Sequence, residues 1–285
     1  MKNTAVVSWG CGLPTGHAPR LAQQLNCKYY QLPSPIIPHE KNIIFVGGFF
    51  GDLAKLQELY NYGDYNLFLI LVGTDILELI GRNIKDPVFE LLNKVKLITV
   101  SKQLKQELKS LNLKSEIITL VPNKTELLNL HTNRTGILFY CPPNKFKIDL
   151  FYAKEIVKVA GALPTFSFYC YGGAQIDTGL SNWHNLGFVT GEEKKELYKK
   201  IKYNVRVAKH DGFPQSIIEL ARLGIPTITN HNFPHIIQIT DTDDIIKQVK
   251  NKIQESNIDI VAMKKYYTDN FTVEQVIKSV EELII

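Results

Sequence analysis

The segment from Val207 to Thr229 constrains the fold more than any other part of this chain. It reads as a short strand, a tight loop, a helix and a second strand, with Pro214 expected in the first helical turn and Gly224 just past the helix end. Pro226 prevents the helix from continuing. The expected helix begins at a loop that contains glycine, so its free N–H groups and positive dipole end form a ready site for a phosphate or diphosphate.

Strands and helices alternate along the rest of the 285 residues, which favours parallel α/β sheets. We expect strands at residues 5–9, 42–46, 67–72, 96–100, 116–121, 137–141, 165–171, 185–189 and 203–207. We expect helices at residues 17–25, 102–111, 150–159 and 192–201, and an amphipathic helix at 273–285. Because the polar stretch 122–135 separates two such runs, we expect a first domain over residues 1–125 and a second over residues 126–272.

Two carboxylates lie on either side of the expected phosphate site. Asp211 comes just before the helix and Glu219 lies eight positions later, a separation of about 12 Å at the helical rise per residue. Eight residues make a little over two turns, so both side chains can point toward the same side. One acid could then accept hydrogen bonds from the hydroxyls of a sugar and the other from a ribose diol. This spacing suits a nucleotide-sugar, and the alternative is an ordinary capped helix with Glu219 on a solvated face.

The run Asp211-Gly-Phe-Pro-Gln-Ser-Ile-Ile-Glu219 resembles the E-G-F-x-x-x-x-x-E motif of retaining GT-B glycosyltransferases, especially glycosyltransferase family 4. The stretches that begin at Leu97, Ile118 and Asn185 resemble further passages of that family in the same order along the chain. The resemblance implies two Rossmann-like domains facing across a cleft, with the C-terminal helix crossing back to the first domain. It also implies transfer of a hexosyl group from a nucleotide-sugar to an acceptor with retained configuration.

The resemblance assigns the donor to the second domain. It implies that Asp211 contacts the transferred sugar, that Glu219 holds the ribose, and that a lysine neutralises the diphosphate. Lys147 is the first choice for that lysine, with Lys145 as the alternative, because the arginine that the family has in this place is absent. Lys209 and Arg206 are rival cations, although a strand residue such as Arg206 could point to solvent. The remaining expected donor-binding residues are Gly212, Phe213 and Pro214 at the helix start, Gly172 in a glycine loop, and Gly187 and Val189, which line the nucleobase or form a plain turn and strand.

The first domain would hold the acceptor. Gly12, in the loop between the first strand and the first helix, leaves room for a phosphate or the donor sugar, and His17 is the nearest imidazole. Val72-Gly-Thr74-Asp75 resembles the family's H-G-x-D, with valine in place of the histidine, so Thr74 and Asp75 are the remaining acceptor-side candidates. The glycine spacing departs from the dinucleotide fingerprint, which argues against NAD.

Composition excludes several kinds of partner and cofactor. The net charge of +5 is spread along the chain without a basic block, which argues against specific nucleic-acid binding and leaves only weak attraction to an anionic membrane surface. The four cysteines are widely spaced, and no His/Cys cluster has the spacing of a metal site, so we expect reduced thiols, a cytoplasmic location and no metal cofactor.

Several choices stay open at the level of the sequence. The acceptor could be a glycan, a lipid, a protein or a small molecule. A sugar-nucleotide epimerase or phosphorylase would share the fold and the diphosphate site. The missing arginine, the substituted histidine and the aspartate at position 211 are also compatible with a catalytically degenerate subunit that only binds a nucleotide-sugar.

Overall fold

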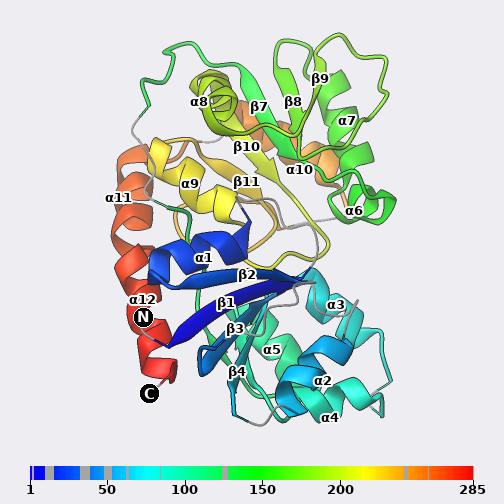
Figure 1. Cartoon of the computed structure of the whole chain (residues 1–285). Coiled ribbons are helices and arrows are strands. Elements are labelled where there is room, and N and C mark those ends of the chain that lie inside the picture. Colours follow the sequence, from blue (N-terminus) through cyan, green and yellow to red (C-terminus); the bar gives the residue numbers. More distant parts are fainter. Residues whose placement is uncertain are drawn as a thin grey trace. The chain divides into compact units, whose positions relative to one another are not determined.

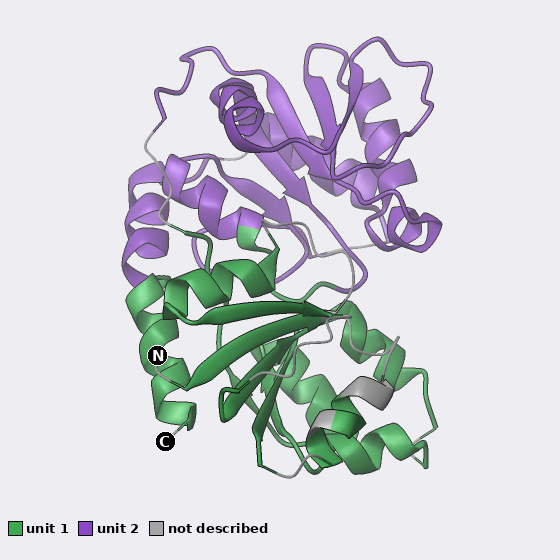
Figure 2. Cartoon of the chain, viewed as in Figure 1, with its two compact units in different colours: residues 1–124, 211–215, 271–285 green, residues 125–210, 216–270 purple. Residues whose placement is uncertain are grey.

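The computed structural model describes residues 1, 3–9, 16–32, 39–47, 53–61, 64–83, 85–123, 128–240, 243–255 and 257–284. The chain folds into two compact units, coloured separately in Figure 2. Unit 1 consists of Met1–Lys124, Asp211–Gln215 and Phe271–Ile285, and unit 2 consists of Thr125–His210 and Ser216–Asn270. The short segment 211–215 therefore packs with unit 1, although the chain on both sides of it belongs to unit 2.

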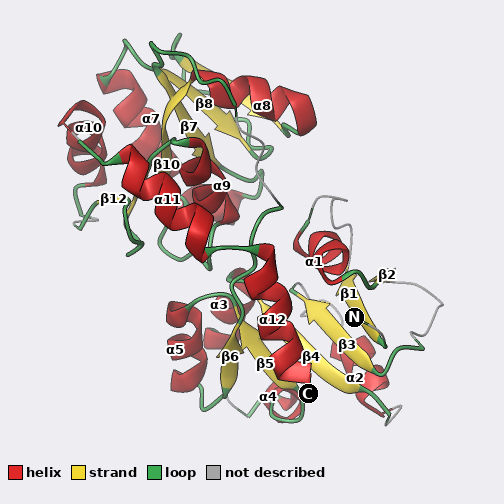
Figure 3. Cartoon of the chain, turned by 90° about the vertical axis from the view of Figure 1, so that its left-hand side faces the viewer, coloured by secondary structure: helices red, strands yellow, loops and turns green. Residues whose placement is uncertain are grey.

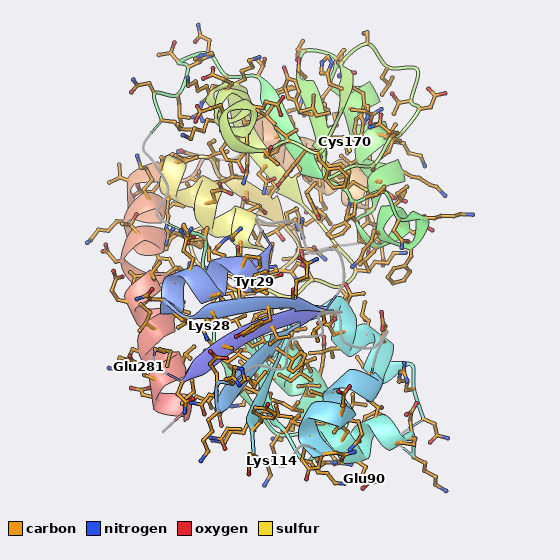
Figure 4. The ribbon with its side chains drawn as sticks, in the orientation of Figure 1. Lys28, Tyr29, Glu90, Lys114, Cys170 and Glu281 are labelled. Carbon is orange, nitrogen blue, oxygen red and sulfur yellow. The ribbon has the colours of Figure 1, made fainter. Side chains whose placement is uncertain are left out.

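Unit 1 contains a six-stranded parallel sheet of order β2-β1-β3-β4-β5-β6 (Figure 1). Its strands are β1 (Thr4–Trp9), β2 (Lys28–Leu32), β3 (Asn42–Val46), β4 (Asn66–Leu71), β5 (Lys96–Thr99) and β6 (Ser115–Ile117). The central strands β3 and β4 are nearly continuous apolar runs with buried side chains, as expected for parallel strands that are covered on both faces. On the edge strand β2, the Tyr29 hydroxyl lies 2.8 Å from the Ser8 hydroxyl, and Tyr29 is labelled in Figure 4.

The helices of unit 1 are α1 (His17–Leu25), α2 (Leu53–Asn61), α3 (Thr74–Ile80), α4 (Pro87–Leu92), α5 (Lys102–Ser110) and the C-terminal α12 (Val273–Ile284). Helix α1 packs against β1 and also against α12. The Lys96 ammonium donates a hydrogen bond to the Leu283 carbonyl of α12 at 3.3 Å. Val276 and Val280 form the buried side of α12, so the C-terminal helix is part of the packing of unit 1.

Unit 2 contains a second six-stranded parallel sheet, of order β12-β11-β10-β7-β8-β9. Its strands are β7 (Gly136–Tyr140), β8 (Ser167–Tyr171), β9 (Trp183–Gly187), β10 (Ile201–Arg206), β11 (Thr227–Thr229) and β12 (Ile237–Gln238). Its helices are α6 (Lys145–Leu150), α7 (Ala153–Ala162), α8 (Gly191–Lys200), α9 (Gln215–Leu223), α10 (Ile245–Glu255) and α11 (Ile260–Asn270). Helices α8 and α9 pack on one face through Leu197 and Leu220, whereas α7 and α10 pack together on the other (Figures 1 and 3).

The two parallel sheets confirm the expected α/β class, and several local expectations were wrong. The single helix expected at 150–159 is two helices, α6 and α7, because Tyr152 adopts a left-handed backbone conformation between them. The strand expected at 185–189 is β9, which ends earlier, at Gly187, where φ is +69°. Helix α9 begins at Gln215, so Pro214 directly precedes the helix instead of lying in its first turn.

Candidate functional site

The strand order of unit 2 creates a point where the chain connections diverge. Strand β7 is followed on one side by β8 and β9, and the chain then returns to β10 on the other side of β7. In open parallel sheets, ligands bind outside the carboxyl ends of the strands at such a switch point. Here β7 ends at Tyr140 and β10 ends at Arg206, and the segment after β10 leads into α9.

Glu219 projects from α9 and makes close contacts with side chains of α8. Both carboxylate oxygens accept hydrogen bonds from the Lys194 ammonium, at 2.9 Å to Oε1 and 2.7 Å to Oε2. The Tyr198 hydroxyl donates to Oε2 at 3.2 Å. The side chains of Glu219 and Lys194 keep 23% and 30% of their surface exposed, so the carboxylate is held in place and still reaches solvent. Glu219 is thus neither buried nor on a freely solvated face.

Two buried tyrosines surround this carboxylate. Burial raises the pKa of Tyr198, and the nearby charge and hydrogen bond of Glu219 raise it further. Burial also raises the pKa of Tyr171, with the Arg206 cation acting in the opposite direction. Both hydroxyls therefore stay protonated at neutral pH, and that of Tyr198 is the donor to Glu219.

Arg206 is buried at the carboxyl end of β10, with 8% of its surface exposed. Its guanidinium lies over two aromatic rings, 4.6 Å from the Tyr140 ring centre and 4.5 Å from that of Phe151. Such stacking fits a guanidinium better than an ammonium. The alternative that Arg206 points to solvent is wrong, and the charge lies at the switch point between β7 and β10.

A glycine loop follows β8 at the same edge of the sheet. The N–H groups of Gly172 and Gly173 both donate to the Gly187 carbonyl, at 2.9 and 3.1 Å, and Val189 packs against the core of unit 2. Gly173 has φ +104°, and an added Cβ there would lie 2.6 Å from the Phe188 ring. The structure therefore brings Gly172, Gly187 and Val189 together.

The lysines expected near the diphosphate differ in their surroundings. Lys145 is exposed at the start of α6, and Lys147 is half-buried two residues later. The exposed Lys209 holds its ammonium 5.4 Å from the centre of the Tyr152 ring, and its backbone N–H donates to the Leu150 carbonyl at 2.9 Å. All three lie on segments that follow β7 or β10.

The loop before α9 contacts other residues of unit 1. The Gly212 N–H donates to the Asp211 carboxylate at 2.9 Å. A Cβ on Gly212 would collide with the Val72 carbonyl oxygen and would lie 2.9 Å from the carbonyl carbon. Phe213 packs against Phe271 with 5.4 Å between ring centres. The absence of a side chain at position 212 is therefore a steric requirement of this loop, and Pro214 follows it as a buried residue.

His17 meets the same loop. The Gln215 side-chain amide donates to His17 Nδ1 at 3.0 Å, so this nitrogen is an acceptor and the other carries the proton. Dense surroundings and the Arg20 charge lower the pKa of His17 to about 4, while Asp211 acts in the raising direction. His17 is exposed, and the hydrogen bond accepted by its Nδ1 also favours the neutral ring at pH 7.

The other acceptor-side candidates lie in and around α3. The Asp75 carboxylate is buried and accepts a hydrogen bond from the Val72 N–H at 3.0 Å, which fixes the turn between β4 and α3. Thr74 is half-buried at the first position of α3. Gly12 lies outside the described residues.

Further features of the described part of the chain concern metal-ligating groups, cysteine thiols and membrane-spanning helices. No group of three or more His, Cys, Asp and Glu side chains is placed there to hold a metal ion. Cys27, Cys141 and Cys170 are free thiols, and burial raises the pKa of Cys141 to about 11 and that of Cys170, labelled in Figure 4, to about 12. No described helix is long and apolar enough to cross a membrane.

Sequence reasoning missed three residues of this site, namely Lys194, Tyr198 and Tyr171. Lys194 and Tyr198 are four residues apart on an expected helix, so the sequence predicts that they share one face of it. Their shared contact with Glu219 could not be predicted, because Glu219 lies on a different helix, 25 residues after Lys194.

Comparisons with known proteins agree at the level of the fold. No protein-family model and no curated protein sequence matches the chain. Among solved structures, sucrose-phosphate synthase from Thermosynechococcus elongatus is similar with a TM-score of 0.72 and 12% identity, over 99% of this chain and 98% of that one. TarM is similar with a TM-score of 0.61 and 15% identity, over 85% of this chain. The pneumococcal O-GlcNAc transferase GtfA, in complex with UDP and GlcNAc, is similar with a TM-score of 0.59 and 15% identity, over 86% of this chain. The chain spans 54% of TarM and 56% of GtfA. These likenesses show the GT-B fold.

Proposed function

We propose that this GT-B protein is a glycosyltransferase that transfers a hexosyl group from a nucleotide-sugar donor to an acceptor with retention of configuration. The observation that carries the proposal is the Glu219 carboxylate, which is held in place on α9 eight residues after Asp211 and still reaches solvent. The full-length likeness to sucrose-phosphate synthase and the UDP bound to GtfA support a nucleotide-sugar as the donor.

In this proposal Glu219 accepts hydrogen bonds from the ribose diol, and Asp211 accepts them from hydroxyls of the transferred sugar. The diphosphate lies at the start of α9, where backbone N–H groups and the positive helix end favour negative charge. Gly172, Gly187 and Val189 border the nucleobase. The acceptor binds to unit 1, near His17 and Thr74.

The reaction follows from these placements. The bond between the anomeric carbon and the donor phosphate oxygen breaks, and its electron pair leaves with the nucleoside diphosphate. The acceptor oxygen forms the new bond on the same face of the sugar, and its proton passes to the departing phosphate oxygen. Fixed dipoles of α9 and a nearby lysine, with Lys147 as the first choice, stabilise the charge that grows on the leaving group.

A screen of nucleotide-sugars by thermal shift tests the proposal. A ligand that binds only the folded protein raises its apparent stability in proportion to its affinity. We expect one nucleotide-sugar and its nucleoside diphosphate to raise the melting temperature, and sugar transfer or slow donor hydrolysis with that donor. If no nucleotide-sugar shifts the melting temperature or is consumed, the proposed function is wrong.

We also propose that the reaction needs no divalent metal, because the α9 dipole and the lysines supply the positive charge. Turnover measured in EDTA should equal turnover in magnesium or manganese. Loss of activity in EDTA that either metal restores would contradict this part of the proposal.

One observation favours a second function, that of a non-catalytic nucleotide-sugar-binding subunit. The carboxylate proposed for the ribose already has both oxygens occupied by Lys194. Donor binding in the thermal-shift screen without any consumption of the donor, in water or with a broad set of acceptors, would identify the protein as such a subunit.

A further inference from the structure

Lys194 occupies the part of the Glu219 carboxylate that a ribose would need. Its ammonium bridges both oxygens, at 2.9 and 2.7 Å, and so occupies one lone pair of each. A vicinal diol that donates two O–H bonds to one carboxylate needs the same pair of positions. Lysine and ribose therefore cannot hold Glu219 in this manner at the same time.

The second partner of Glu219 does not share this conflict. The Tyr198 hydroxyl approaches only Oε2, at 3.2 Å, and the side chain is buried with 2% of its surface exposed. Lys194 is partly exposed and ends 5.3 Å from the centre of the Tyr198 ring. Tyr198 is therefore a fixed support for the carboxylate, whereas the flexible stem of Lys194 allows its ammonium to move into solvent.

Helix stability does not account for a lysine at this position. Lys194 is the fourth residue of α8, near the positive end of the helix dipole, where a cation is unfavourable. Glu192 and Glu193 in the same turn have the sign that stabilises a helix start. Among the described residues, Arg222 is also close to Glu219, and its Nε donates to the Tyr267 carbonyl at 3.4 Å. The bridging contact with Glu219 is thus the main interaction of Lys194.

We propose that Lys194 is a positioning residue that competes with the donor ribose for Glu219. It orients the carboxylate and neutralises it while the donor is absent, and it swings away when the ribose diol binds. This inference rests on the proposed role of Glu219 in donor binding. It follows that a weaker Lys194–Glu219 pair increases the affinity for ribonucleotides, and a stronger pair decreases it.

Calorimetric titration of uridine, guanosine and adenosine diphosphate tests the competition, with the tightest of the three used for the variants. Lys194→Met removes the charge and keeps the chain length, so affinity should rise about two- to five-fold, the range expected for a partly exposed ion pair. Lys194→Arg offers a two-pronged donor to the carboxylate, so affinity should fall. Lys195→Met is the matched control, because Lys195 is the next residue on α8 and pairs with Glu192 instead. It should leave the affinity unchanged.

The 2′,3′-dideoxy form of the same nucleotide separates competition from a structural effect. It cannot donate the two hydrogen bonds, so Lys194→Met and wild type should bind it equally. Wild type alone gives a further measurement: the affinity for the uncharged ribonucleoside should rise between about 0.05 and 0.5 M salt, because salt screens the exposed ion pair.

The outcomes distinguish this inference from the function on which it rests. If a ribonucleotide binds wild type and Lys194→Met binds it no more tightly, the competition is overturned and the donor site stands. Equal tightening for the dideoxy form would also overturn the inference, because the ribose would not be involved. If no nucleotide binds wild type or Lys194→Met, both the inference and the proposed function are wrong.

Discussion

The carboxyl edges of the two sheets use their acidic side chains in different ways. In unit 1 the Asp75 carboxylate is buried and accepts a hydrogen bond from the backbone of its own turn, at Val72. In unit 2 the Glu219 carboxylate is partly exposed and binds the side chains of Lys194 and Tyr198 on a neighbouring helix. A carboxylate satisfied by its own backbone stabilises a fold, whereas one held by a movable ammonium can exchange that partner for a ligand. The same sheet architecture thus supports a structural acid and a candidate ligand-binding acid.

The largest expected effect concerns the loop before α9. Gly212→Ala should lower the apparent free energy of unfolding by about 1–3 kcal/mol, because the new methyl group would collide with the Val72 carbonyl. Chemical denaturation measures this change. Gly161→Ala on α7 is the control, since its Cβ would make only ordinary contacts with Leu180, at 3.7 Å, and alanine favours a helix. Equal stability of Gly212→Ala and wild type would show that the loop does not pack against Val72 in this way.

The second prediction concerns the structural acid of unit 1. Asp75→Ala leaves the Val72 N–H without its side-chain acceptor and should cost about 1–2 kcal/mol of stability. Nucleoside diphosphate affinity should not change, because the proposed donor contacts lie elsewhere. Glu78→Ala, an exposed position on the same helix, should change neither quantity. A selective loss of donor affinity in folded Asp75→Ala would remove the distinction between the two acids.

The third prediction concerns the pH response of His17. Its pKa is about 4 in the folded protein and 6.5 in an unfolded chain. Between those values the unfolded chain binds the proton and the folded protein does not, so stability should decrease as pH falls from 6.5 to about 4 and level off below. NMR titration of the ring should give the lowered pKa, and Gln215→Leu should raise it by removing the donor to Nδ1. An ordinary His17 pKa in wild type would show that neither packing nor the hydrogen bond from Gln215 favours the neutral ring.

Local sequence patterns predicted much of this architecture. Helix α1 and strand β3 have the expected bounds, because each combines a clear apolar period with distinct ends. The left-handed Tyr152 that separates α6 from α7 was not predictable, since nothing in residue type favours that conformation there. A strand was expected to end near residues 31–33, but the start of β2, at Lys28, could not be placed because its mixture of polar and aromatic residues lacks an apolar run.

The candidate site also has features that the sequence predicts and features that it does not. Spacing alone predicted Asp211 and Glu219 as a pair, because both belong to one loop and helix, and this pairing stays a prediction. It did not show that Arg206 would be buried between Tyr140 and Phe151, since those rings come from β7 and from the end of α6. Nor did it show that Asp75 turns to its own backbone at Val72. Contacts within one element follow from sequence period, whereas contacts between elements require the packing itself.

The central claim is that Glu219 binds the donor ribose, and calorimetric titration of a nucleoside diphosphate against Glu219→Ala tests it most directly. Removing charge-assisted hydrogen bonds worth about 1.5–3 kcal/mol should weaken binding about 10- to 150-fold. Circular dichroism should show an intact fold, because alanine is a good helix former at this interior position of α9. Glu219→Gln, which keeps the shape and loses the charge, should lie between wild type and Glu219→Ala. If folded Glu219→Ala binds the nucleoside diphosphate as tightly as wild type, Glu219 does not hold the ribose and the donor-site assignment is contradicted.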